Sequence, residues 1–155
     1  MRMIIAPAKK MTVDTDSFAV DGTPVFLEQA ERLKTILQGM SAKELQELWK
    51  CSDAIAKQNT ERLTDMDLRR CLTPAILAYE GIQYRYMAPG VMAEAQLDYL
   101  REHLRILSGL YGLLRPFDGV TPYRLEMQAR ASIGSAKDSG ETVWPARWPQ
   151  KQILC

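Results

Sequence analysis

The apolar residues of this chain occur in short runs, and the clearest of these runs end at a proline or a glycine. Residues 3–6 form one run that stops at Pro7, and residues 75–79 form another that is closed by Gly81. No run approaches the roughly 20 apolar residues that a membrane-spanning helix needs, so that class is excluded. Short runs separated by turn residues favour several small elements over one long helix.

Length and composition are those of one soluble domain. The chain has 155 residues, of which 46% are hydrophobic and 25% charged, and a chain of this size buries about 70% of its unfolded surface. Disordered and coiled-coil classes are therefore excluded. Three cysteines without paired spacing fit a reducing compartment, and the first residues lack a secretory signal. We expect a cytoplasmic protein.

The first half of the chain predicts one strand followed by helices. Residues 3–6 suit a buried strand, and the leucines after Pro24 recur at helical spacing. Three helices are predicted. The first begins at Pro24 with Thr23 as its cap, and the second begins with a capping box of Ser41 and Glu44. The third begins at Ser52 and presents one stripe, formed by Ile55, Ala56, Asn59 and Leu63.

The second half predicts a strand, a helix and a turn. Residues 75–79 are short and apolar, which favours a strand over a helix. Leucines from Leu97 to Leu107 recur every three or four residues and predict an amphipathic helix, and residues 108–116 then form a structured turn. The predicted fold class is α+β, with helices packed around a small mixed sheet.

Positive charge gathers toward the end of the chain as arginine. The net charge is +1, but residues 1–100 sum to −2 and residues 101–155 to +3. Between Lys57 and Lys137 all nine basic residues are arginine, the side chain suited to forked recognition of phosphate and carboxylate. An arginine-rich codon bias explains the same pattern without a ligand.

Residues 101–127 carry the candidate site. Arginines and tyrosines surround two glycines that allow close approach of a ligand, which suits an anion such as a phosphate. Alternatively, the glycines only turn the chain, and Arg115 and Arg124 pair with Asp118 and Glu126. The candidate DNA- or phosphate-binding residues are Lys9, Arg105, Ser108, Gly109, Tyr111, Gly112, Arg115, Tyr123 and Arg124.

Several segments resemble one known family, the YaaA-type peroxide stress proteins. The stretch His-Leu-Arg-Ile-Leu-Ser-Gly-Leu-Tyr-Gly-Leu-Leu-Arg-Pro-Phe-Asp at residues 103–118 is similar to the most recognisable block of that family, and Pro-Tyr-Arg-Leu-Glu-Met follows it at residues 122–127. The opening Ile-Ile-Ala-Pro-Ala-Lys and residues 40–53 and 74–81 resemble it in order and spacing. One departure is Ala6, where serine is common in the family.

The resemblance implies a function and a binding mode. It implies a cytoplasmic role in the response to hydrogen peroxide that limits damage from free iron, together with DNA binding that is not specific for sequence. The family's DNA binding is associated with a helix-hairpin-helix element. The helix ending near Leu107 and the turn at residues 108–112 are the matching candidate here.

The resemblance stops near residue 138. We therefore expect an incomplete YaaA-like domain at residues 1–138, the front part of a larger fold, and a tail outside the family at residues 139–155. Two prolines and two tryptophans in that tail show no periodicity, which suggests that the end of the sequence is frameshifted or mispredicted. A domain lacking part of its family fold would expose apolar surface, and self-association through that surface is then expected.

Two other functions remain as alternatives. One is an enzyme acting on a small phosphorylated or nucleotide-like ligand, with Lys9 or Tyr111 as acid or base. The other is direct iron binding, which a single histidine, His103, supports poorly even with oxygen ligands from Asp118 and Glu126. No metal site and no cofactor are predicted.

Overall fold

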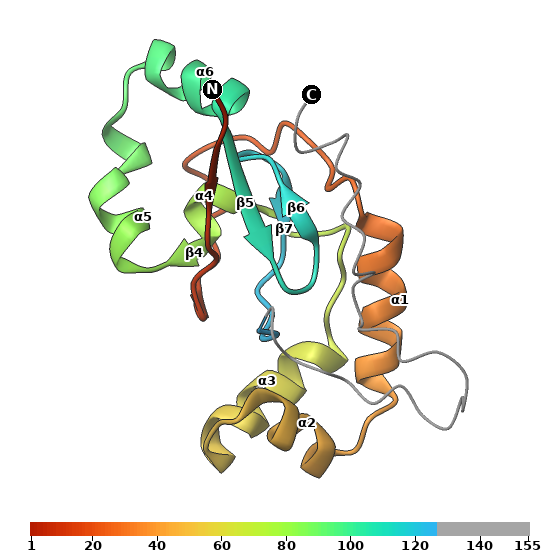
Figure 1. Cartoon of the computed structure of the whole chain (residues 1–155). Coiled ribbons are helices and arrows are strands. Elements are labelled where there is room, and N and C mark those ends of the chain that lie inside the picture. Colours follow the sequence, from red (N-terminus) through yellow and green to blue (C-terminus); the bar gives the residue numbers. More distant parts are fainter. Residues whose placement is uncertain (127–155) are drawn as a thin grey trace.

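The computed structural model describes residues 1–126, in which helices alternate with short strands (Figure 1). The elements, in chain order, are β1 (Met3–Ile5), β2 (Lys10–Met11), α1 (Leu27–Gln38), α2 (Ala42–Trp49), α3 (Asp53–Thr64), β3 (Thr73–Pro74), α4 (Ala75–Ala78), β4 (Tyr79–Glu80), α5 (Ile82–Met87), the 3-10 helix η1 (Pro89–Val91), α6 (Glu94–His103), β5 (Leu104–Ser108), β6 (Gly112–Leu114) and β7 (Gly119–Val120). The predicted α+β class is confirmed. No helix in these residues is long and apolar enough to cross a lipid bilayer.

A three-stranded sheet lies at the centre, with the strand order β1-β5-β6. Strand β1 pairs in parallel with β5, so that Ile4 lies opposite Arg105, and β6 pairs antiparallel with β5. Two further antiparallel pairs, β2 with β4 and β3 with β7, flank it. The parallel pair therefore joins an early strand to a late one, and the helices of residues 1–126 lie between β1 and β5 in sequence.

Local sequence signals explain α2 and α3. The amide N–H of Ser41 donates to Glu44 Oε2 at 2.7 Å, and the Ser41 hydroxyl accepts the Glu44 N–H at 3.3 Å, so the predicted capping box is confirmed. Helix α3 follows Ser52 as predicted. Its predicted stripe is correct except at Ile55, which is 40% exposed.

Helix α1 begins later than predicted. Pro24 opens a turn, in which its carbonyl accepts the Leu27 N–H at 3.2 Å, and the first helical residue is Leu27. Phe26 occupies the cap position, and no side chain caps the helix. The prediction that Thr23 caps a helix starting at Pro24 is therefore wrong, because the proline directs a turn before the helix.

The predicted strand over residues 75–79 is also wrong. Most of this run forms the short helix α4, between β3 and β4. Its first amides find acceptors in a distant turn: the Ala75 N–H donates to Asp118 O at 2.9 Å and the Ile76 N–H to Pro116 O at 2.8 Å. Those tertiary hydrogen bonds satisfy the start of a helix too short to form alone.

The amphipathic helix predicted through Leu107 ends early, at His103. From Leu104 the backbone is extended, and Leu104, Ile106 and Ser108 are buried in alternation as β5. Pairing with β1 on one side and β6 on the other determines this conformation. The segment proposed as a helix-hairpin-helix is therefore a strand, a turn and a strand, and that prediction is wrong.

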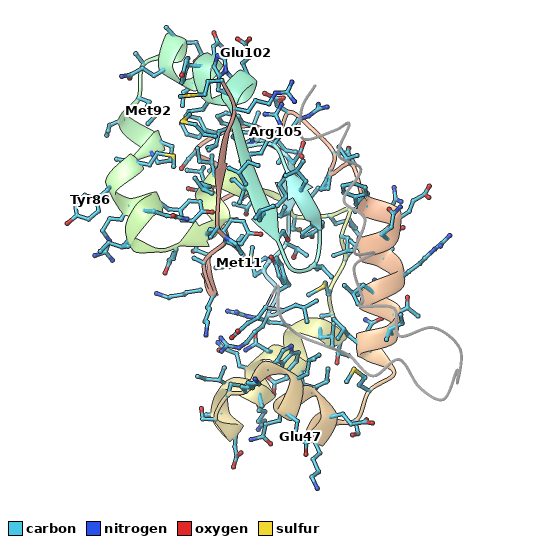
Figure 2. The ribbon with its side chains drawn as sticks, in the orientation of Figure 1. Met11, Glu47, Tyr86, Met92, Glu102 and Arg105 are labelled. Atoms are coloured by element: carbon cyan, nitrogen blue, oxygen red, sulfur yellow. The ribbon has the colours of Figure 1, made fainter. Side chains whose placement is uncertain are left out.

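The core packs against one face of the sheet, as the alternating burial along β5 shows, and continues among the helices. Ile106 of β5 and Leu114 of β6 are fully buried within it. Helix α5 instead leaves Ile82 75% and Tyr86 83% exposed, and Figure 2 shows Tyr86 projecting away from the body. Self-association through such apolar side chains stays a prediction, and the boundary predicted at residue 138 lies outside the described residues.

Replacing Gly109 is expected to destabilise the fold. A Cβ at this position would lie 2.2 Å from the carbonyl oxygen of Leu125, which is backbone and cannot swing aside. We expect Gly109→Ala to lower the free energy of unfolding by about 3 kcal/mol in urea denaturation. Gly90→Ala is the control, because no atom lies within 4 Å of its added Cβ. Equal stability of the two variants would contradict this packing.

Candidate functional site

Three arginines gather at the amino ends of the parallel strands. Arg2 precedes β1, Arg105 lies on β5 and Arg115 follows β6, and together they line a hollow of about 370 Å³. We call this hollow the arginine groove. Its apolar wall consists of Val25, Phe26, Leu113 and Leu114. The register that places Ile4 opposite Arg105 brings Arg2 to the same end of the sheet.

The three guanidinium groups of the arginine groove are not paired with acids, and the one carboxylate close to them, that of Asp118, is buried. None of its three guanidinium groups forms an ion pair with a carboxylate of residues 1–126. Burial lowers the pKa of Arg105, and the charges of Arg2 and Arg115 lower it further. Its Nη1 donates to the carbonyl oxygens of Arg101 at 3.1 Å and Leu104 at 2.6 Å, which fixes the side chain in place.

A buried carboxylate holds the backbone of one of the groove arginines in place. Asp118 is fully buried, and its Oδ2 accepts the backbone N–H of Arg115 at 2.8 Å. Burial raises the pKa of Asp118, and its Oδ1 has no hydrogen-bond partner among the described residues. The alternative that Asp118 pairs with the guanidinium of Arg115 is therefore not what the structure shows: the contact is to the backbone, and it shapes the loop.

Arg101, beside the groove, is neutralised. It forms ion pairs with Asp21 at 3.0 Å, Glu94 at 2.9 Å and Asp98 at 2.7 Å, and its guanidinium lies 4.5 Å from the ring centre of Phe117. Hydrogen bonds to these acids raise its pKa. Arg101 therefore ties α6 to the loops around it and leaves its charge unavailable to a ligand.

Three of the candidate residues, Ser108, Tyr111 and Tyr123, lie in a buried hydroxyl network at the other end of β5. The Tyr123 hydroxyl contacts Ser108 Oγ at 2.7 Å and the Tyr79 hydroxyl at 2.9 Å. Ser108 Oγ also accepts the N–H of Tyr111 at 2.9 Å. The Tyr111 hydroxyl accepts the N–H of Thr121 at 3.1 Å, and its side chain is fully buried. Tyr111 is therefore a structural residue, and its burial does not support the alternative in which it acts as an acid or base.

Lys9 and Arg124 lie beside this network. They line a pocket of about 280 Å³ with Pro7, Ala8, Tyr123, Leu125 and Glu126. Lys9 Nζ lies 2.8 Å from Glu126 Oε1, and this hydrogen bond lowers the pKa of Glu126. Glu126 therefore pairs with Lys9 and not, as the alternative held, with Arg124.

The four predicted cations do not converge on one cleft. Arg105 and Arg115 line the arginine groove, whereas Lys9 and Arg124 line the pocket beyond the other end of β5. Figure 2 shows Arg105 near the upper end of that strand. The two glycines serve the fold: Gly109 packs on the backbone of Leu125, and Gly112 has a positive φ of 75° at the turn into β6.

Sequence reasoning missed Arg2 and Tyr79. Arg2 joins the groove only through the parallel pairing of β1 with β5, and no local pattern signals such a pairing. Tyr79 was assigned to a predicted strand, with no sign that its hydroxyl contacts Tyr123. Within residues 1–126, no group of three or more His, Cys, Asp or Glu side chains lies close enough to hold a metal ion.

Comparison with known proteins shows which family this chain is similar to. A family model described as peroxide stress protein YaaA matches residues 1–152. A UPF0246 protein of Pediococcus pentosaceus is 59% identical over 133 residues, which are 86% of this chain and 53% of that protein. A UPF0246 protein of Lactiplantibacillus plantarum is 51% identical over 158 residues, 99% of this chain and 64% of that protein. The chain thus spans between about half and two thirds of the length of these curated relatives.

The buried tyrosines predict a loss of stability at alkaline pH. Burial raises the pKa of Tyr79, Tyr84, Tyr111 and Tyr123 above the ordinary value of about 10. Above about pH 10 the unfolded chain loses these protons before the folded protein does, so the stability that is fully present below about pH 10 is lost as the pH rises further. We expect the free energy of unfolding in urea to fall above about pH 10 and to fall less steeply in Tyr123→Phe. An unchanged free energy up to about pH 11 would contradict this.

Proposed function

The chain belongs to the peroxide stress protein YaaA family, and we propose that it acts in the cytoplasmic response to peroxide by binding DNA through the arginine groove. The proposal rests on one observation above the others: three guanidinium groups share a hollow with no carboxylate paired to them in residues 1–126. Phosphate groups are the natural partners for such a cluster.

The proposed binding is to the DNA backbone. Arginines that neutralise phosphates contribute affinity and position, but they carry no sequence information. The strands β5 and β6 and the turn between them present no helix to a major groove. We therefore expect duplexes of different sequence to bind with similar affinity. This part of the proposal replaces the helix-hairpin-helix with a groove beside the sheet.

We also propose that this binding underlies a role in limiting damage from free iron. A protein that covers the DNA backbone protects it without holding the metal itself. The observation that favours this route is that the cluster of unpaired charge is cationic, which repels a metal cation and attracts the polyanion. Protection is then expected to depend on the arginine groove.

The double variant Arg2→Ala, Arg115→Ala tests the proposal. Both side chains are exposed, so their removal leaves the core intact. For the whole chain binding a mixed-sequence duplex, we expect the affinity to fall at least about tenfold, and the slope of log affinity against log salt to become shallower by roughly 2. Fluorescence anisotropy over a salt series measures both quantities.

Arg85→Ala is the matched control, because this exposed arginine lies on α5 and does not line the groove. We expect its affinity and salt slope to equal those of the wild type. Wild-type affinity that does not change with salt would overturn the proposal. So would an equal loss in Arg85→Ala, since binding would then depend on overall charge and not on the groove.

A further inference from the structure

The pocket beside Lys9 occupies a position that suits a small ligand. Because β1 and β5 are parallel, the loops that follow them leave the sheet at the same edge. The pocket lies at this edge, walled by residues 7–9 after β1 and by residues 123–126. Ligands commonly bind beyond the carboxyl ends of parallel strands, where such loops converge. We call this hollow the carboxyl-end pocket.

The walls of the carboxyl-end pocket are fixed before any ligand arrives. The carbonyl oxygen of Ala6 accepts the hydroxyl of Tyr84 at 2.8 Å, and Gly81 lies so close to Ala8 that an added Cβ would be 3.0 Å away. On the other side, the hydroxyl of Tyr123 is held by Ser108 and Tyr79. A preformed pocket loses little conformational entropy on binding, which favours affinity.

The charges around the pocket are unbalanced. Glu126 pairs with Lys9, and the charges of Arg124 and Lys50 also lower its pKa. Neither Arg124 nor Lys50 forms an ion pair with an acid of residues 1–126. Of the residues that line the pocket, Lys9 and Arg124 therefore share one carboxylate, that of Glu126, and one positive charge is left without an anion.

Hydrogen-bond donors are also left without acceptors. Arg124 Nε is buried and has no partner among the described residues, and the same holds for Trp49 Nε1, whose side chain is 2% exposed. Trp49 lines a void of about 10 Å³ that adjoins the pocket and shares Tyr123, Arg124 and Leu125 with it. Buried donors are normally paired, so this edge of the fold lacks acceptor atoms.

We propose that the carboxyl-end pocket binds the phosphate group of a small phosphorylated molecule, with Lys9 and Arg124 as its ligands. A phosphate monoester supplies the acceptor oxygens that the site lacks, and its two negative charges match the two cations that line the pocket, Lys9 and Arg124. A carboxylate supplies one charge, which Glu126 already provides. Glu126 pairs with Lys9 in this structure, and the phosphate would displace it from Lys9 on binding. The size of the pocket suits a small molecule, and this site does not depend on the arginine groove.

Calorimetric titration of the whole chain with inorganic phosphate tests the proposal. We expect saturable binding at one site, weakened about tenfold in Lys9→Ala because a charge-assisted hydrogen bond is lost. Glu126→Gln removes the competing carboxylate and keeps the shape of the side chain, so its affinity for phosphate should rise severalfold. Acetate, a monoanion, should bind more weakly than phosphate.

Lys10→Ala is the matched control. Lys10 is the next residue, similarly exposed at 79% against 70% for Lys9, and pairs with Glu80 instead of lining this pocket. We expect it to bind phosphate like the wild type. An equal loss in Lys10→Ala, the absence of saturable phosphate binding, or equal affinities for acetate and phosphate would each overturn the proposal.

A DNA duplex distinguishes a small phosphorylated molecule from nucleic acid as the source of the phosphate. Lys9→Ala should leave duplex affinity unchanged, whereas Arg115→Ala should lower it. If Lys9→Ala weakened duplex binding as much as Arg115→Ala, the pocket would belong to the DNA-binding surface and the small-molecule assignment would fail. If the wild type bound inorganic phosphate but did not bind the duplex, the proposal for the arginine groove would fail and the proposal for the pocket would stand.

Discussion

The parallel pairing of β1 with β5 is the constraint on which the rest of this structure depends. It joins the first residues of the chain to a segment that follows every helix of residues 1–126, with Met3 opposite Leu104 and Ile5 opposite Ile106. The intervening helices must therefore pack around a sheet whose two parallel strands are far apart in the sequence (Figure 1). The same pairing gives the sheet two different ends, because parallel strands place both of their amino ends on one side and both carboxyl ends on the other.

The hydroxyl network at the carboxyl end of β5 connects the sheet to the segments packed beside it. Tyr123 connects Ser108 at the end of β5 with Tyr79 of β4, and its own N–H lies 3.5 Å from the sulfur of Met11. Residues from four segments are therefore held at one point. A buried hydroxyl network is stabilising only when its members find partners, since an unpaired buried hydroxyl costs about 1–3 kcal/mol. In this network each hydroxyl has a hydrogen-bond partner. The network therefore positions the segment that carries Arg124 and Glu126.

The elements that sequence predicted well are those determined within a few residues. The capping box of Ser41 and Glu44 and the start of α3 at Ser52 depend only on neighbouring side chains. The predictions failed where a distant partner decides the conformation: β1 and β6 hold Leu104 and Leu107 in a strand although their spacing also fits a helix. The same limit explains the sites. Sequence identified Lys9, Arg105, Arg115 and Arg124, but the direction of β5 divides them between two ends of the sheet.

The separation of the two sites sets how strongly they can influence one another. Arg105 and Ser108 are three residues apart on β5, which at about 3.3 Å per residue is a distance of roughly 10 Å. This is close to the screening length of about 8 Å at physiological ionic strength. Lys9 and Arg115 are both exposed, so solvent and salt weaken the interaction between anions bound at the two ends. The parallel strands thus support both proposed anion sites, and we expect the binding energies of the two sites to be close to independent.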